Sequence, residues 1–297
     1  MAKFDAYQMA TDRITALLEQ GVKPWAQPWV CSLNCAWSGS TGKPYSLLNQ
    51  MLLIDPHIHN LEEAMADVRG EWVTYKQAQQ RGGHVKAGEK GRKVVFYSPM
   101  EITEEVDGQE VKKTIPYLTA YTVFKVTQCE GLTQKYHNED TPAFAFKGDA
   151  GAQEVADGYL LRSGVKYAPV RGSQAYYRPS TDTVVTPLPE QFEQPAEYYS
   201  TLFHELTHST GHPSRLNRLD STAAFGNEVY SLEELVAEIG SASLLATIGV
   251  ETPDSLNNSA AYIGNWLKAL KNDKRMIVRA AGRAEKAVRL ILGLEAA

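Results

Sequence analysis

The segment from Tyr198 to His208 constrains the fold more than any other part of the chain, because it places an H-E-x-x-H pattern in an otherwise apolar, helix-compatible run. Residues four apart share one face of an α-helix, so His204 and His208 can offer two imidazoles to one metal ion. Glu205, next to the first of them, can take a proton from water beside that metal and is the candidate catalytic base. The alternative is a solvated helix on which two histidines align by chance, and a third ligand would decide between these interpretations.

Three downstream residues compete for the role of third ligand. His212 extends the histidine row, but eight residues of helix rise about 12 Å, whereas ligand atoms meet within about 2 Å of a zinc ion. Gly211 and Pro213 also indicate that the first helix stops here. We therefore expect His212 beside the site rather than in it.

A second helix supplies the better candidates. Ser231 and Glu234 have the spacing of a capping box, which predicts that this helix opens at Ser231, and apolar residues between positions 232 and 244 form its buried stripe. Glu234 and Glu238 share one face, where two carboxylates need a cation or hydrogen-bond donors. We predict Glu234 as the ligand and Glu238 as the acceptor of the spare N–H of a metal-binding histidine, although spacing alone leaves their order open.

This combination resembles the zincin metallopeptidases of the Glu-ligand type. The resemblance implies a Zn²⁺ ion, or another divalent ion such as Mn²⁺, held by His204, His208 and one glutamate, with Glu205 as general base. Upstream, residues 174–178 and 182–186 are β-rich runs around a turn, which predicts a hairpin. In zincins, a sheet edge beside the metal binds the substrate in extended form.

Composition indicates a globular chain with 43% hydrophobic and 22% charged residues, enough for one large core or two ordinary ones. The odd number of cysteines, at positions 31, 35 and 129, favours a reducing compartment. The sequence shows no transmembrane run and no signal peptide, so we expect a cytoplasmic protein without a membrane partner. The charge is uneven: residues 69–93 hold seven bases and two acids, whereas residues 137–297 hold fifteen bases and twenty acids. This asymmetry predicts two modules with different partners.

The N-terminal module combines bases with aromatic side chains. A helix is expected over residues 4–18, and a Gly-rich basic loop at 82–92 leads into a strand at 93–97 that pairs with 117–124 across an acidic tip at 101–110. Cations that neutralise phosphates and aromatic faces that stack on bases are what single-stranded DNA requires. The candidate DNA-binding residues are Lys43, Lys76, Arg81, Lys86, Lys90, Arg92, Lys93, Trp25, Trp29 and Tyr45. The alternatives are a solvated charged hairpin and tryptophans that belong to the core.

Nearly the whole chain resembles the ArdC-type antirestriction proteins of conjugative plasmids. The resemblance runs through Asp5-Ala6-Tyr7, Gly21-Val22-Lys23-Pro24-Trp25, Gly42-Lys43-Pro44-Tyr45, Trp72-Val73-Thr74-Tyr75, Gly88-Glu89-Lys90-Gly91, the metal motif, Glu233-Glu234-Leu235-Val236-Ala237-Glu238 and Tyr262-Ile263-Gly264-Asn265-Trp266-Leu267. It implies a single-stranded-DNA-binding domain fused to a zincin-like metallopeptidase domain, and protection of incoming DNA from host restriction.

We therefore predict an α+β protein with a mixed α/β nucleic-acid-binding domain at 1–135, a linker at 136–150 and a zincin-like metallopeptidase domain at 151–297. The expected partners are single-stranded DNA and an unidentified protein substrate, for which the restriction machinery is the candidate source. The alternative function is a non-catalytic DNA-binding protein whose metal braces the fold. Glu205 separates the two hypotheses, because a structural metal site does not need a base.

Overall fold

The computed structural model describes residues 4–20, 24–26, 36–55, 57–58, 67–106, 109–135, 148–219, 228–250 and 260–294. Its helices are α1 (Ala6–Glu19), α2 (Leu47–Leu52), α4 (Tyr75–Gln80), α5 (Gly148–Ser163), α6 (Pro195–Ser209), α7 (Glu228–Ile248), α9 (Ala260–Asn272) and α10 (Met276–Leu292). Its strands are β1 (Ala36–Ser38), β2 (Gly70–Thr74), β3 (His84–Val85), β4 (Arg92–Val106), β5 (Gln109–Lys125), β6 (Cys129–Glu130), β7 (Lys166–Tyr167), β8 (Tyr176–Arg178) and β9 (Thr183–Val185). The predicted mixture of helices and sheets is confirmed.

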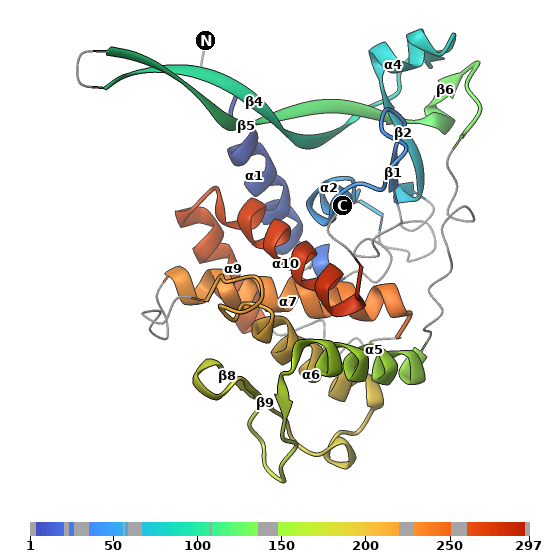
Figure 1. Cartoon of the computed structure of the whole chain (residues 1–297). Helices are drawn as coiled ribbons and strands as arrows, with labels where there is room; N and C mark the ends of the chain where they lie inside the picture. Colours follow the sequence, from blue (N-terminus) through green and yellow to red (C-terminus); the bar gives the residue numbers. More distant parts are fainter. Residues whose placement is uncertain are drawn as a thin grey trace.

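The elements form three levels (Figure 1). The long β4–β5 ribbon crosses the top, α1, α2, α7, α9 and α10 occupy the middle, and α5, α6 and the small β7–β9 sheet lie at the bottom. No helix in the described part of the chain combines the length and apolarity that crossing a membrane requires.

The upper sheet has the strand order β1-β2-β5-β4, so β4 is an edge strand. The predicted pairing of residues 93–97 with 117–124 is confirmed, with Lys93 opposite Thr122 and Tyr97 opposite Leu118. The expected acidic tip is not a loop, since Glu101 is paired with Thr114 and β4 continues to Val106. β-branched residues within this acidic stretch favour an extended ribbon over a turn.

The lower sheet has the order β7-β9-β8, with β8 at one edge. β8 and β9 are antiparallel and are joined by the 3₁₀ turn Pro179–Thr181, so the hairpin predicted at residues 174–186 is confirmed. Asp182 closes the turn with φ of 48°, in the left-handed region. Asp is one of the few non-glycine residues that adopts this conformation at modest cost.

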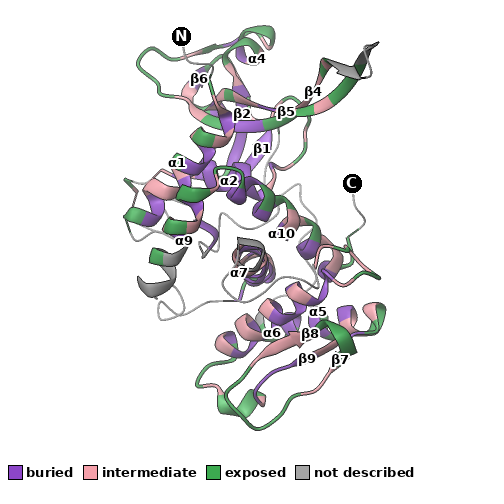
Figure 2. Cartoon of the chain, turned by 90° about the vertical axis from the view of Figure 1, so that its left-hand side faces the viewer, coloured by how far each residue is buried: buried purple, intermediate pink, exposed green. Residues whose placement is uncertain are grey.

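The middle helices form a core that both predicted modules share. α1 and α2 pack on α10, and the turn Pro24–Ala26 lies against α7. One contiguous cluster of buried side chains includes Ile14 and Leu47 from the N-terminal part and Leu235 and Ile277 from the C-terminal part. Figure 2 shows these buried residues where the middle helices meet.

Polar contacts cross the same boundary. Glu285 of α10 accepts a hydrogen bond from the backbone N–H of Leu47 at the start of α2, over 3.1 Å. Lys274 forms an ion pair with Asp5, the N-cap of α1, over 2.6 Å. Residues 148–150, which the sequence prediction placed in the linker, belong to α5, while 136–147 lie outside the described residues.

Candidate metal centre

α6 places the H-E-x-x-H residues along one side of a buried helix. Pro195 occupies the first turn, where its missing N–H has no helical partner to lose. Leu202, Phe203 and Leu206 are at most 1% exposed and pack into the core, which leaves the histidines on the opposite, partly exposed side. α6 ends at Ser209, so the helix stops before Gly211 as expected.

α7 approaches α6 closely enough to bring its glutamates to the histidines. Thr207 of α6 is fully buried and faces Gly240 of α7, where a Cβ would lie only 2.6 Å from Thr207 Cγ2. Any larger residue at position 240 would push the two helices apart. The expectation that α7 opens at Ser231 is wrong, because the helix already includes Glu228 and Ser231 lies inside it.

His204, His208 and Glu234 converge on one point, with ligand atoms within 4.8 Å of one another. The two histidine Nε2 atoms are 3.2 Å apart. Glu234 oxygens lie 3.6 Å from His204 Nε2 and 3.4 Å from His208 Nε2. Ligands bonded at 2.0–2.1 Å in a tetrahedron stand about 3.3 Å apart, so these three residues fit a divalent metal. They form the sole such cluster among the described residues.

Glu233 contacts the far side of His208, a role that the sequence interpretation gave to Glu238. His208 Nδ1 lies 3.1 Å from Glu233 Oε1, which orients the imidazole so that Nε2 faces His204 and Glu234. Glu238 stands one turn beyond Glu234, and its charge acts on His204 instead. The hydrogen-bonding role predicted for Glu238 is therefore taken by Glu233 at His208, because adjacent helix positions face different neighbours.

Arg218 holds Glu233 in place. Its Nε and Nη2 atoms donate to the two oxygens of Glu233 over 3.0 and 2.8 Å, in a forked geometry. Arg218 also donates to the backbone carbonyl of Thr207 on α6. Burial raises the pKa of Glu233, but the contacts with His208 and Arg218 lower it below its usual value, so the carboxylate stays charged. The sequence offered no signal for Arg218, which lies in the turns after α6.

Glu205 is 7% exposed and lies among the predicted ligands. Burial raises the pKa of Glu205 above its usual value, and the charge of Glu234 adds to this, while the histidines act in the opposite direction. The backbone of Tyr177 acts to lower the pKa of the same carboxyl, and edge strand β8 packs against α6. A carboxylate with a raised pKa is a stronger proton acceptor and suits a general base.

His212 lies outside this cluster. Its Nδ1 atom contacts Ser214 Oγ at 2.7 Å in the turn that follows α6. It also lies close enough to Asp182 to affect the pKa of that carboxyl. This position agrees with the expectation that His212 is not in ligand position.

Some of the predicted DNA-binding residues are paired or buried within the protein, and others are exposed. Arg92 is engaged internally by Asp67 and Asp55, and Arg81 by Glu71, so these two candidate arginines are paired within the protein. The aromatic candidates Trp25 and Tyr45 are 1% and 5% exposed and belong to the core, so they offer no open face to a base. The candidates that remain exposed are Lys43, Lys76, Lys86, Lys90 and Lys93. Trp29 lies outside the described residues.

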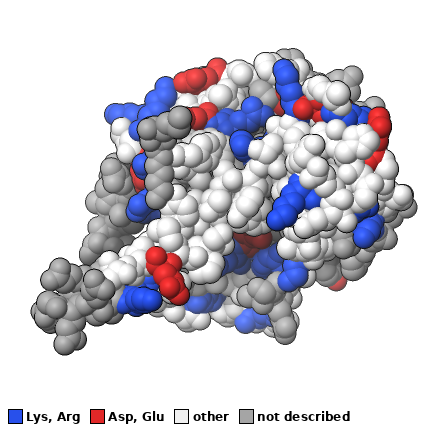
Figure 3. All heavy atoms as spheres, turned by 90° about the horizontal axis from the view of Figure 1, so that it is seen from above, with Lys and Arg blue, Asp and Glu red and all other residues white. Residues whose placement is uncertain are grey.

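Other aromatic side chains are exposed on the β4–β5 ribbon. Phe96, Tyr97 and Tyr121 are 37%, 53% and 40% exposed. Phe96 and Tyr121 lie diagonally on one face with ring centroids 5.9 Å apart, and Tyr45 supports Phe96 at the same separation. Seen from above, a largely uncharged surface is bordered by both basic and acidic side chains (Figure 3). The sequence predicts which residues of β4 and β5 share a face. It does not predict which of their aromatic side chains remain exposed, because that depends on where the helices pack against the ribbon.

Comparisons with known proteins agree with this geometry. Residues 4–124 match the family model described as the N-terminal domain of anti-restriction factor ArdC, and residues 154–283 match a zincin-like metallopeptidase model. Two proteins of Escherichia coli named DNA primase TraC are each 34% identical over 97% of this chain, which spans 27% and 20% of their lengths. The uncharacterized protein y4eC of Sinorhizobium fredii is 30% identical over 95% of this chain and 90% of its own length.

Solved structures extend the comparison to the whole fold. The Mn(II)-bound structure of the antirestriction protein ArdC from plasmid R388 is 37% identical and covers 98% of both chains, with a TM-score of 0.73. The metal-free structure of that protein has a TM-score of 0.71, and the match covers 99% of this chain and 100% of the R388 chain. Because its N-terminal part matches the ArdC model and its whole length matches the R388 protein, the chain belongs to the ArdC family of antirestriction proteins.

Proposed function

We propose that this protein binds single-stranded DNA and protects incoming plasmid DNA from host restriction, and that its metal centre hydrolyses a peptide bond. The observation that carries the peptidase proposal is the convergence of His204, His208 and Glu234 with Glu205 buried beside them. A structural metal site needs ligands but no adjacent base. We take Zn²⁺ as the native metal, with Mn²⁺ as the alternative.

The residues of this chain have distinct tasks in the proposed reaction. A divalent metal, when bound, supplies Lewis acidity that lowers the pKa of water and polarises a carbonyl. Glu205 accepts the proton of the attacking water and delivers it to the leaving amine. Glu233 and Arg218 fix the orientation of His208. β8 is an edge strand that pairs with β9 on one side, and its other edge is the proposed place for a substrate in extended conformation.

The β4–β5 ribbon is the proposed DNA-binding surface. Phe96 and Tyr121 present exposed rings on which unpaired bases stack, and exposed lysines such as Lys90 and, on the other face of β4, Lys93 contact phosphates. Lys93 extends from β4 and lies 5.9 Å from the ring of Phe4. We propose that the peptidase substrate is a protein of the restriction machinery that meets this DNA.

The replacement Glu205→Gln tests the peptidase proposal. It removes the base but keeps the shape of the side chain and all three ligands, so metal content and DNA affinity should remain as in the wild type. Hydrolysis of casein should fall by about 10²-fold or more, the scale of a lost general base. Glu197→Gln, on the first turn of the same helix, is the matched control.

Plasmid transfer into a restricting host gives the biological readout. Loss of protection in Glu205→Gln, with DNA binding intact, would make hydrolysis the mechanism of protection. Full protection by this variant would contradict that mechanism and favour coating of single strands by the ribbon.

A further inference from the structure

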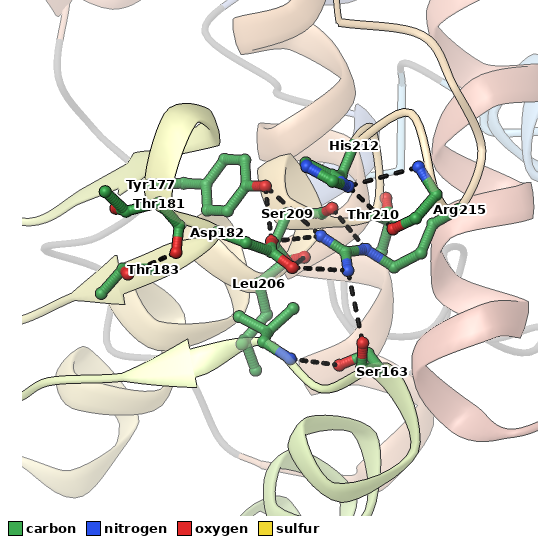
Figure 4. Close-up of polar contacts among 12 residues, drawn as sticks. Ser163, Tyr177, Thr181, Asp182, Thr183, Leu206, Ser209, Thr210, His212 and Arg215 are labelled. Atoms are coloured by element: carbon green, nitrogen blue, oxygen red, sulfur yellow. Dashed lines mark hydrogen bonds and ion pairs between the residues drawn. The ribbon is translucent and has the colours of Figure 1, made fainter.

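Arg215 ties the β8–β9 hairpin to the end of the H-E-x-x-H helix (Figure 4). Its guanidinium donates to both carboxylate oxygens of Asp182, over 3.0 Å from Nη1 and 2.5 Å from Nη2. Nε donates to the backbone carbonyl of Ser209, the last residue of α6, over 2.8 Å. The Arg215 side chain is only 7% exposed, so these contacts form away from solvent, where charge-assisted hydrogen bonds are strongest.

Tyr177 connects this cluster to the proposed base. Its hydroxyl donates to Asp182 Oδ1 over 2.7 Å and accepts from Arg215 Nη2 over 3.3 Å. Its strand, β8, packs against α6, the helix that carries Glu205. A single residue of β8 is therefore fixed at its side chain by the buried arginine and belongs to the strand that lies against the helix of the base.

The position of Tyr177 matters because β8 is an edge strand. β9 pairs with β8 on one side only, in the order β7-β9-β8. β8 also packs against α6, the helix that carries Glu205. An extended chain added to the free edge of β8 would be aligned by a strand that lies against the helix of the base, so a small shift of β8 would displace the substrate relative to Glu205.

We propose that Arg215, Asp182 and Tyr177 form a positioning network that holds edge strand β8 in register with Glu205 and thereby aligns an extended substrate. This inference rests on the proposed peptidase function but concerns residues outside the ligand set. None of the three is a catalytic residue, since each acts through β8. Asp182 is central, because its left-handed conformation turns the chain back into β9 while its carboxylate bridges Arg215 and Tyr177.

Asp182→Asn tests the network with little disturbance to the fold. Asn has the same shape and also tolerates the left-handed region, but it removes the charge that binds Arg215. Tyr177→Phe is a second variant, which removes only the hydroxyl. Asp273→Asn is the matched control, because Asp273 pairs with Arg279 at the remote turn between α9 and α10.

The readout compares two metal-directed probes on Zn²⁺-loaded full-length protein. Acetohydroxamate needs only the metal centre, whereas a hydroxamate on an extended tripeptide also needs the strand edge. We expect Asp182→Asn and Tyr177→Phe to weaken tripeptide hydroxamate by about tenfold, because misalignment removes contacts along β8. Acetohydroxamate affinity and zinc affinity should stay within about twofold, since the ligands are untouched. Asp273→Asn should change neither.

Three results would overturn the proposal. If wild type bound the two hydroxamates with equal affinity, the peptide part of the tripeptide probe would contribute nothing, and β8 would not contact an extended chain. Unchanged tripeptide binding in both variants would show that the network does not position β8. Parallel loss of both probes would show that it acts on the metal centre as a whole. Failure of the peptidase proposal is separate: wild type would then cleave no casein while the two-probe difference persisted.

Discussion

At the residue scale, the adjacent glutamates Glu233 and Glu234 take different partners. Glu234 points its oxygens at the two Nε2 atoms, and Glu233 contacts Nδ1 of His208 from behind. Successive residues on a helix are turned by about 100°, so one carboxylate can face a ligand site while its neighbour faces a supporting arginine. Loss of Glu233 would leave His208 with an unfixed ring and Arg218 with a buried, unpaired charge.

Glu233→Gln should therefore weaken zinc binding by about 10–100-fold, the usual cost of removing the partner of a metal-binding histidine. Glu238→Gln, one turn further along the same face as Glu234, should cost less, because its effect on His204 is through charge. Competition with a chromogenic chelator measures both affinities. A larger loss in Glu238→Gln than in Glu233→Gln would restore the original assignment of Glu238.

Arg92 shows why some residue roles could not be predicted from the sequence. A basic patch is visible as composition, but the partners of Arg92 are Asp55 and Asp67, which are distant in the sequence. The H-E-x-x-H histidines are predictable because their geometry is local to one helix. Arg218 and Glu233 are not, because their contact depends on how α6, the following turns and α7 pack.

Arg92→Gln should destabilise the fold rather than alter DNA binding. It leaves Asp67 and the carbonyl of Leu53 without a buried charged donor, for which we expect a loss of about 1–3 kcal/mol in the free energy of unfolding. Lys90→Gln, an exposed neighbour, should leave stability unchanged and reduce the salt slope of single-strand binding by about 0.7. Urea titration and salt-dependent anisotropy distinguish these effects, and a reduced slope in Arg92→Gln would contradict the internal role.

At the scale of elements, the β4–β5 ribbon combines the proposed DNA-binding face with protected edges. Pro99 and Pro116 lie opposite each other on this ribbon. Proline cannot donate to a neighbouring strand, so the pair opposes edge-to-edge association of two ribbons. The ribbon is longer than the two predicted strands, because the pairing between β4 and β5 extends through the acidic stretch to Val106 and Gln109.

Phe96→Ala and Tyr121→Ala should each weaken single-stranded DNA binding by about 1–3 kcal/mol, the value of one lost stacking contact. The salt slope should not change, since no phosphate contact is removed. Leu161→Ala, which replaces an 87% exposed apolar residue on α5, is the control. Wild-type affinity in both aromatic variants would move the binding surface away from this face.

At the scale of the whole molecule, charge asymmetry suggested two modules, but their apolar surfaces form one core. Trp25 is 1% exposed and belongs to the turn that lies against α7, the helix that carries Glu234. Sequence patterns identify which faces are apolar but not which helices those faces meet. The alternative that Trp25 is a core residue is the one that the structure supports.

Trp25→Ala should therefore lower the free energy of unfolding by about 3–5 kcal/mol, the usual cost of emptying a buried aromatic site.

Zinc should raise the unfolding midpoint of the wild type in one transition, whether the probe lies in the N-terminal or the C-terminal part, because a ligand stabilises every part of a cooperative unit. Differential scanning calorimetry and tryptophan fluorescence test this. Two separable transitions, with only one shifted by zinc, would show independent domains.

The shared core also constrains how such a protein changes during evolution. α10 covers apolar surface of α1 and α2 on one side and of α7 on the other. A recombination event that exchanged either half for an unrelated sequence would leave these surfaces of α10 open to water. The antirestriction and metallopeptidase-like parts are therefore expected to be inherited as one block, even when that block is fused into a much longer polypeptide.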